Sequence, residues 1–93
     1  MNFSEFKLNK VIEETANTDL LTSREKHLIG LAVTTTRGCI KCTEGRITKA
    51  IKSDISYETL LAAIDLAGAV NAGVTLAIAI QGANAARINA KGE

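Results

Sequence analysis

The apolar residues of this chain recur at the spacing of an α-helix, and they do not alternate with polar residues as in a half-buried strand. The chain contains no proline, which would end or kink a helix. We therefore predict an all-α fold, a small bundle of five to six helices. The expected helices cover residues 4–15, 22–37, 39–52, 56–68 and 74–90.

Residues at the expected helix ends are of the types that begin and end helices. Thr22 and Glu25 match a capping box, in which the threonine hydroxyl accepts a hydrogen bond from the glutamate backbone N–H and the glutamate carboxylate accepts one from the threonine backbone N–H. Ser56 is a good N-cap for the fourth helix. Gly38 can adopt the left-handed conformation that follows a helix. The Asn-Ala-Gly sequence at residues 71–73 predicts a break between the last two helices.

Apolar residues at helical spacing identify a candidate core. In the second helix they fall at i, i+3, i+4 and i+7, which places them on one stripe. The candidate core residues are Phe6, Val11, Ile12, Leu28, Leu31, Ala32, Thr35, Ile40, Ile47 and Ile51.

The apolar stretch at residues 60–80 is about long enough to cross a bilayer. Asp65 and Asn71 interrupt it, and a charge inside a span is costly. We therefore expect two closely packed, buried helices of a soluble protein, and no membrane contact. Asp65 should then pair with a cation or face a polar cavity. Gly82 should mark a close helix contact, because glycine is unfavourable in a free helix.

The length of 93 residues allows a single domain, 1–93, with one small core. A domain of this size is marginally stable alone. The two cysteines would close too short a loop to constrain the unfolded chain much. Self-association is therefore the expected source of further stability.

The charge pattern argues against several classes of protein. The net charge is +1, acidic and basic residues are interspersed, and there are three aromatic residues, which argues against a nucleic-acid-binding surface. The first residues do not form a charged-then-apolar signal sequence, so we expect a cytoplasmic protein.

The two cysteines, Cys39 and Cys42, are separated by two residues at the expected start of the third helix. Side chains three apart share a helix face and are close enough to form a disulfide. Free N–H groups and the helix dipole favour a thiolate at that place, and Arg37, Lys41 and Arg46 add positive charge. The pattern predicts reactive sulfur, with no cofactor required.

Two other interpretations of the pair stay open. The cysteines could be small buried apolar residues without chemistry. They could also bind zinc, although the pair and His27 supply at most three protein ligands, so we expect no metal.

Three segments together resemble one known family. They are SREKHLIGLAV at residues 23–33, GCIKC at residues 38–42 and the helix start SYE at residues 56–58. This combination resembles the carboxymuconolactone decarboxylase superfamily, in its alkylhydroperoxidase-D-like branch, over roughly residues 20–90. The resemblance implies an oligomeric all-helical domain, often a trimer or hexamer, with thiol–disulfide chemistry at the cysteines. Decarboxylase members lack the cysteine pair, so that activity is disfavoured.

The chain departs from that branch at both positions of its proton relay. The branch usually has a histidine four residues after the second cysteine, where this chain has Arg46. It has a glutamate twelve residues before the first cysteine, where this chain has His27. An arginine stays charged at neutral pH and can stabilise a thiolate, whereas His27 could act as the base.

We therefore predict a thiol-dependent peroxidase or disulfide reductase with Cys42, Cys39, His27 and Arg46 as site residues. Its partners would be a peroxide, a thiol reductant protein or small dithiol, and further copies of the chain. Position alone favours Cys39 as the attacking residue, since it is nearer the helix start and should be more exposed. The resemblance favours Cys42, and Arg46 lies one turn beyond it, so we choose Cys42. The alternative is a non-enzymatic redox sensor or scaffold.

Overall fold

The computed structural model describes residues 1–92, and in that range it consists of four α-helices and one short 3₁₀ turn, with no strand. The elements are η1 (Phe3–Glu5), α1 (Lys7–Ala16), α2 (Ser23–Thr36), α3 (Ile40–Lys52) and α4 (Tyr57–Ala85). The all-α prediction is confirmed. The prediction of five to six helices is wrong, because the last two expected helices form one continuous helix.

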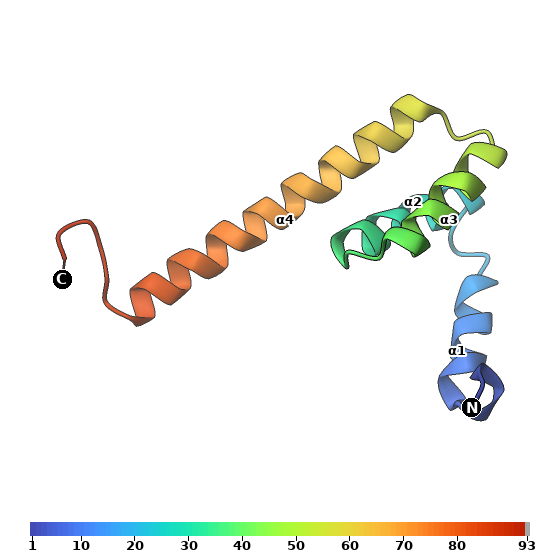
Figure 1. The fold of residues 1–93 in the computed structure, drawn as a ribbon, viewed down its shortest axis with the longest axis horizontal. Coiled ribbons are helices and arrows are strands. Elements are labelled where there is room, and N and C mark those ends of the chain that lie inside the picture. The colour runs from blue at the N-terminus through green and yellow to red at the C-terminus, as the bar shows by residue number, and fades with distance from the viewer. Residues whose placement is uncertain (93) are drawn as a thin grey trace.

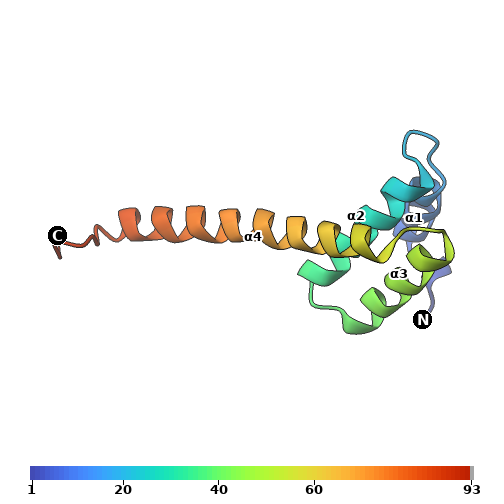
Figure 2. The ribbon, with the colours of Figure 1, turned by 90° about the horizontal axis from the view of Figure 1, so that it is seen from above.

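Helices α2 and α3 form an antiparallel hairpin, and α4 returns alongside α2 (Figures 1 and 2). Thr34 lies next to Thr43, and His27 lies next to Ser53, so the numbering of α2 and α3 runs in opposite directions. α4 starts near the start of α2 and continues far past its end. α1 projects from the other side of the hairpin.

The core lies where α2, α3 and the start of α4 meet. Leu31 is fully buried, together with Ala50, Ile55 and Leu60, and Leu28 and Ile47 pack against them. Leu31 comes from the predicted stripe of α2. Ile55 belongs to the short connection between α3 and α4. This one cluster therefore holds α2, α3 and the start of α4 together.

The predicted caps of α2 and α4 and the turn at Gly38 are confirmed, whereas α1 begins at Lys7 instead of residue 4 and α4 ends at Ala85 instead of residue 90. Thr22 and Glu25 form the capping box of α2, Ser56 caps α4, and Gly38 has the left-handed φ of +78°. The hydrogen bond that the Thr22 backbone N–H donates to Glu25 lowers the pKa of that carboxyl. The capping contribution of Glu25 is therefore present above the pKa that this carboxyl has in the unfolded chain, and it is lost as pH falls through the lower folded value.

The predicted break at residues 71–73 does not occur, because α4 runs unbroken for 29 residues. The Asn71 side-chain amide donates to the Ala67 carbonyl, and the Thr75 hydroxyl donates to the Asn71 carbonyl. These polar side chains therefore bond within the helix instead of competing with its backbone bonds. The alanines and leucine around them favour helix and offset the cost of Gly73.

α4 is apolar but exposed, so the prediction of two closely packed buried helices is wrong for the single chain. Beyond Asn71 its large side chains are between 56 and 65% exposed; they are Val74, Leu76, Ile78 and Ile80. A Cβ added at Gly82 would meet no atom within 4 Å, so the expected close contact is not made within the chain. By length and composition alone α4 could cross a membrane, with a mean hydropathy of 1.8 over its most apolar window.

α1 contributes little to the core. Phe6, Val11 and Ile12 were expected to be buried, yet each is more than half exposed. The chain is elongated, with a radius of gyration of 18.4 Å, whereas a compact chain of this length would have about 12 Å. Both ends of the molecule therefore carry apolar surface that the chain does not cover.

Replacing Leu31 by alanine should lower the free energy of unfolding by about 2–5 kcal/mol, the usual cost of a cavity at a buried leucine. Leu20→Ala is the matched control, since Leu20 is 93% exposed and should cost far less. Denaturant titration followed by circular dichroism measures both. Equal losses in the two variants would contradict this assignment of the core.

Candidate functional site

Cys39 and Cys42 form a disulfide at the start of α3, with their Cα atoms 5.3 Å apart. Cys39 is the N-cap of the helix, and its Sγ accepts a hydrogen bond of 3.2 Å from the Cys42 backbone N–H. Cys42 lies in the first turn. The predicted pairing and its place at a helix start are both confirmed, so the sulfurs lie where the helix dipole favours negative charge.

The end of α2 holds this segment in place. Gly38 turns the chain through its left-handed conformation, and the Cys39 backbone N–H donates to the Thr34 carbonyl. The Thr43 hydroxyl lies 3.1 Å from the Thr34 hydroxyl, which joins the first turn of α3 to the last turns of α2. The cysteine pair therefore rests on a hydrogen-bonded helix junction and not on a free loop.

The two sulfurs differ in their surroundings. Cys39 is partly buried and lines a shallow hollow of about 370 Å³, whose walls include Thr34, Thr43 and Ile47. Cys42 is exposed and does not line that hollow. The expectation that Cys39 is the more exposed cysteine is therefore wrong. A bulky reaction partner would reach Cys42 first.

His27 lies at the opposite end of α3 from the cysteines. Its Nε2 is 3.2 Å from the hydroxyl of Ser53, the C-cap residue of α3. From Cys42 to Ser53 the helix rises about 16 Å. Within one chain His27 therefore cannot contact either sulfur. Its predicted role as the base would require the His27 of another copy of the chain.

Arg46 lies across α2 at Gly30. A Cβ built on Gly30 would be 2.5 Å from the guanidinium carbon, so the absence of a side chain makes room for the arginine. Arg46 lines the groove between α1 and the hairpin together with Lys26, His27 and Lys49. The hollow at Cys39 does not include it. The structure thus brings the two cysteines together but groups Arg46 with His27 on another face.

The charged residues near the pair are free of ion pairs. Arg37 and Lys41 are exposed, and the salt bridge found in residues 1–92 joins the N-terminal amine to Glu5. Asp65 is exposed as well, and within residues 1–92 its carboxylate forms no ion pair, so the predicted pairing with a cation is not made within the chain. In the same range, no three side chains of His, Cys, Asp or Glu gather as metal ligands would.

Sequence reasoning did not identify Thr34, Thr43 and Ser53 as part of these contacts. The run of three threonines at residues 34–36 was the available signal. Their hydroxyls donate to carbonyls three or four residues back in the same helix. Thr43 follows Cys42 directly, and helical spacing alone places it toward the preceding helix.

No family model, no curated protein and no solved structure matches this chain. The family resemblance described above therefore stays a prediction that depends on the motifs themselves.

Gly30→Ala should stabilise the chain less than Gly45→Ala, although both glycines are within helices. A Cβ at Gly45 meets no atom within 4 Å, so that variant should gain about 0.5–1 kcal/mol in unfolding free energy. At Gly30 the gain is offset because the Arg46 guanidinium must move. In an Arg46→Ala background the two glycine variants should gain the same unfolding free energy. Denaturant titration of the single and double variants tests this. An unchanged difference would show that Arg46 is not the cause.

Proposed function

We propose that this protein is a dithiol–disulfide oxidoreductase, a thiol-dependent peroxidase or disulfide reductase. The observation that carries the proposal is the Cys39–Cys42 disulfide, which joins an N-cap sulfur to an exposed sulfur in the first turn of α3. A helix start favours the thiolate, which is the reactive form of cysteine. The exposed member of such a pair meets the substrate and the other resolves the product.

In the peroxidase reaction, the Cys42 thiolate attacks the terminal oxygen of a hydroperoxide. The S–O bond forms as the O–O bond breaks, and the alkoxide leaves and takes up a proton as the alcohol. The Cys39 thiolate then attacks the Cys42 sulfenic acid, the S–S bond forms, and hydroxide leaves and is protonated to water. The observed disulfide is the product of this second step.

A thiol reductant returns the two electrons. Its first thiolate attacks the exposed Cys42 sulfur, a mixed disulfide forms, and Cys39 leaves as a thiolate. The Cys42 backbone N–H, which already bonds Cys39 Sγ, stabilises that leaving group. The second thiolate of the reductant then attacks its own sulfur in the mixed disulfide, so that Cys42 leaves as a thiolate and the reductant leaves as a disulfide. The reverse sequence reduces a substrate disulfide, so one geometry serves both reactions. A cytoplasmic protein would draw on the thiol reductants that keep such pairs reduced.

The exposed apolar surface of α4 favours a second candidate, a redox-sensing oligomer without turnover. In that protein the disulfide would change the assembly instead of a substrate. The two candidates differ in one measurable property, which is multiple turnover with a dithiol reductant.

The reduced wild type should consume a hydroperoxide over many turnovers with a dithiol reductant, and Cys42→Ser should reduce the rate to background. Cys39→Ser should turn over more slowly than wild type, because the external reductant must then attack the Cys42 sulfenic acid in place of Cys39. Absorbance or dye-based peroxide assays measure turnover. A wild type that reacts only stoichiometrically would favour the redox sensor.

A sulfenic-acid-specific reagent, added after one equivalent of peroxide, identifies the attacking residue. Label is expected in Cys39→Ser and not in Cys42→Ser. The reverse pattern would assign the attack to Cys39, in the hollow beside Thr34 and Thr43.

His27→Ala should leave the pH profile of turnover in place, because the ring lies at the far end of α3 from the sulfurs. Its effect should be a small loss of unfolding free energy, which Ser53→Ala should reproduce. Rates measured from pH 5 to 8, the range in which histidine titrates, test this. Loss of the acidic limb in His27→Ala alone would restore His27 as the base, supplied by another copy of the chain.

A further inference from the structure

The chain exposes much more surface than a compact monomer of its mass. Its accessible surface is 7771 Å² for 9.8 kDa. The scaling for folded monomers gives about 5,200 Å², an excess of about 2,600 Å² per chain. A standard protein interface buries about 800 Å² on each partner, and obligate ones bury about 1,000–2,500 Å² on each. The excess is therefore of the size that an obligate interface removes.

Two apolar features of α2 and α4 contribute to this excess. The first, which we call the overhang, is residues 72–85 of α4, about 21 Å of helix beyond the end of α2. Its large apolar residues cover more than half of the helix circumference, so α2 could not shield them even if it were longer. A helix that is apolar nearly all round is stable in water only when something surrounds it.

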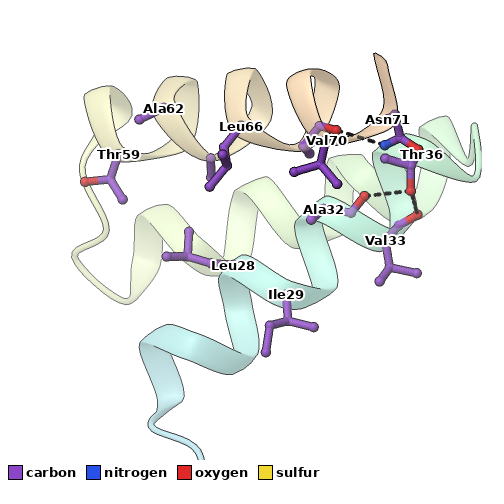
Figure 3. Close-up of a pocket in the computed structure, with 12 residues that line it drawn as sticks. Leu28, Ile29, Ala32, Val33, Thr36, Thr59, Ala62, Leu66, Val70 and Asn71 are labelled. Carbon is purple, nitrogen blue, oxygen red and sulfur yellow. Dashed lines mark hydrogen bonds between the residues drawn. The ribbon is translucent and has the colours of Figure 1, made fainter. Parts of the chain in front are cut away.

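The second feature is a groove between α2 and the first half of α4, with a volume of about 600 Å³ (Figure 3). Leu28, Ala32 and Val33 line it from α2, and Ala62, Leu66 and Val70 line it from α4. The groove ends at Thr36 and Asn71, where α4 leaves α2. None of its lining residues is charged.

The two features match each other in chemistry. The overhang contains no charged residue, and neither does the groove. Both belong to the same chain, but the overhang is a rigid continuation of α4 and leads away from its own groove. A second copy covers both at once, because it brings a groove for the overhang and an overhang for the groove.

A membrane would cover less of this surface. It could surround α4, but it would leave the α2 side of the groove exposed. The overhang also contains Gln81 and Asn84, whose side-chain amides a helix in hydrocarbon would leave without partners.

We propose that the overhang of one copy packs into the α2–α4 groove of a second copy, in a closed assembly in which every overhang is covered. Gly73 and Gly82 face open space in the single chain, and in the assembly they let the neighbouring helices approach closely. This contact lies outside the cysteine pair, so it is independent of the proposed redox chemistry.

The test uses one charged variant on each side of the contact and one control. Leu76→Lys alters the overhang, Val33→Glu alters the groove, and Leu20→Lys places a charge on an exposed leucine outside both. Analytical ultracentrifugation at micromolar concentration should show wild type and Leu20→Lys as oligomers, and the other two as helical monomers. Val33 and Leu76 are more than half exposed, so neither variant disturbs the core.

Mixing the two monomeric variants tests the geometry. The Val33→Glu chain keeps an intact overhang and the Leu76→Lys chain an intact groove, so the mixture should form mixed oligomers. If the overhangs instead paired with each other, mixing would not restore the contact, because every mixed pair would contain one altered overhang. A monomeric wild type, a mixture that stays monomeric, or a wild type that binds phosphatidylcholine vesicles instead of assembling would each overturn the proposal.

Discussion

The burial of Leu31 is the contact on which the rest of this structure depends. It belongs to one cluster with Ala50 of α3, Ile55 of the following connection and Leu60 of α4, and these four are the buried apolar residues of the range 1–92. Through them the hairpin is closed and the direction of α4 is set. Such a small core leaves little margin, because a domain of this length is marginal even when compact.

The local features of the fold could be predicted from the sequence because each depends on neighbouring residues. The capping box at Thr22, the left-handed turn at Gly38 and the cap at Ser56 need no distant contact, and the disulfide needs only a spacing of three on a helix start. The stripe of α2 also gave Leu31 correctly, since helical periodicity identifies the inward face.

What could not be predicted depends on contacts between distant segments. The sequence Asn-Ala-Gly at residues 71–73 is typical of a helix break, yet α4 continues because its polar side chains bond within the helix. The position of His27 follows from the antiparallel register of α2 and α3, which residue types alone do not give. The apolar residues of α1 and α4 predict that these helices pack against another surface. The sequence pattern does not determine whether that surface belongs to the same chain.

The core has a further consequence for the order of folding. Its members are close in sequence, since α2, α3 and the start of α4 follow one another through short connections. Folds with such local contacts form in microseconds to milliseconds, faster than two dilute chains meet. In the proposed assembly, the hairpin would therefore be complete before a second copy covers the far half of α4. In a newly made chain, that interval is when aggregation competes, and its length falls as the chain concentration rises.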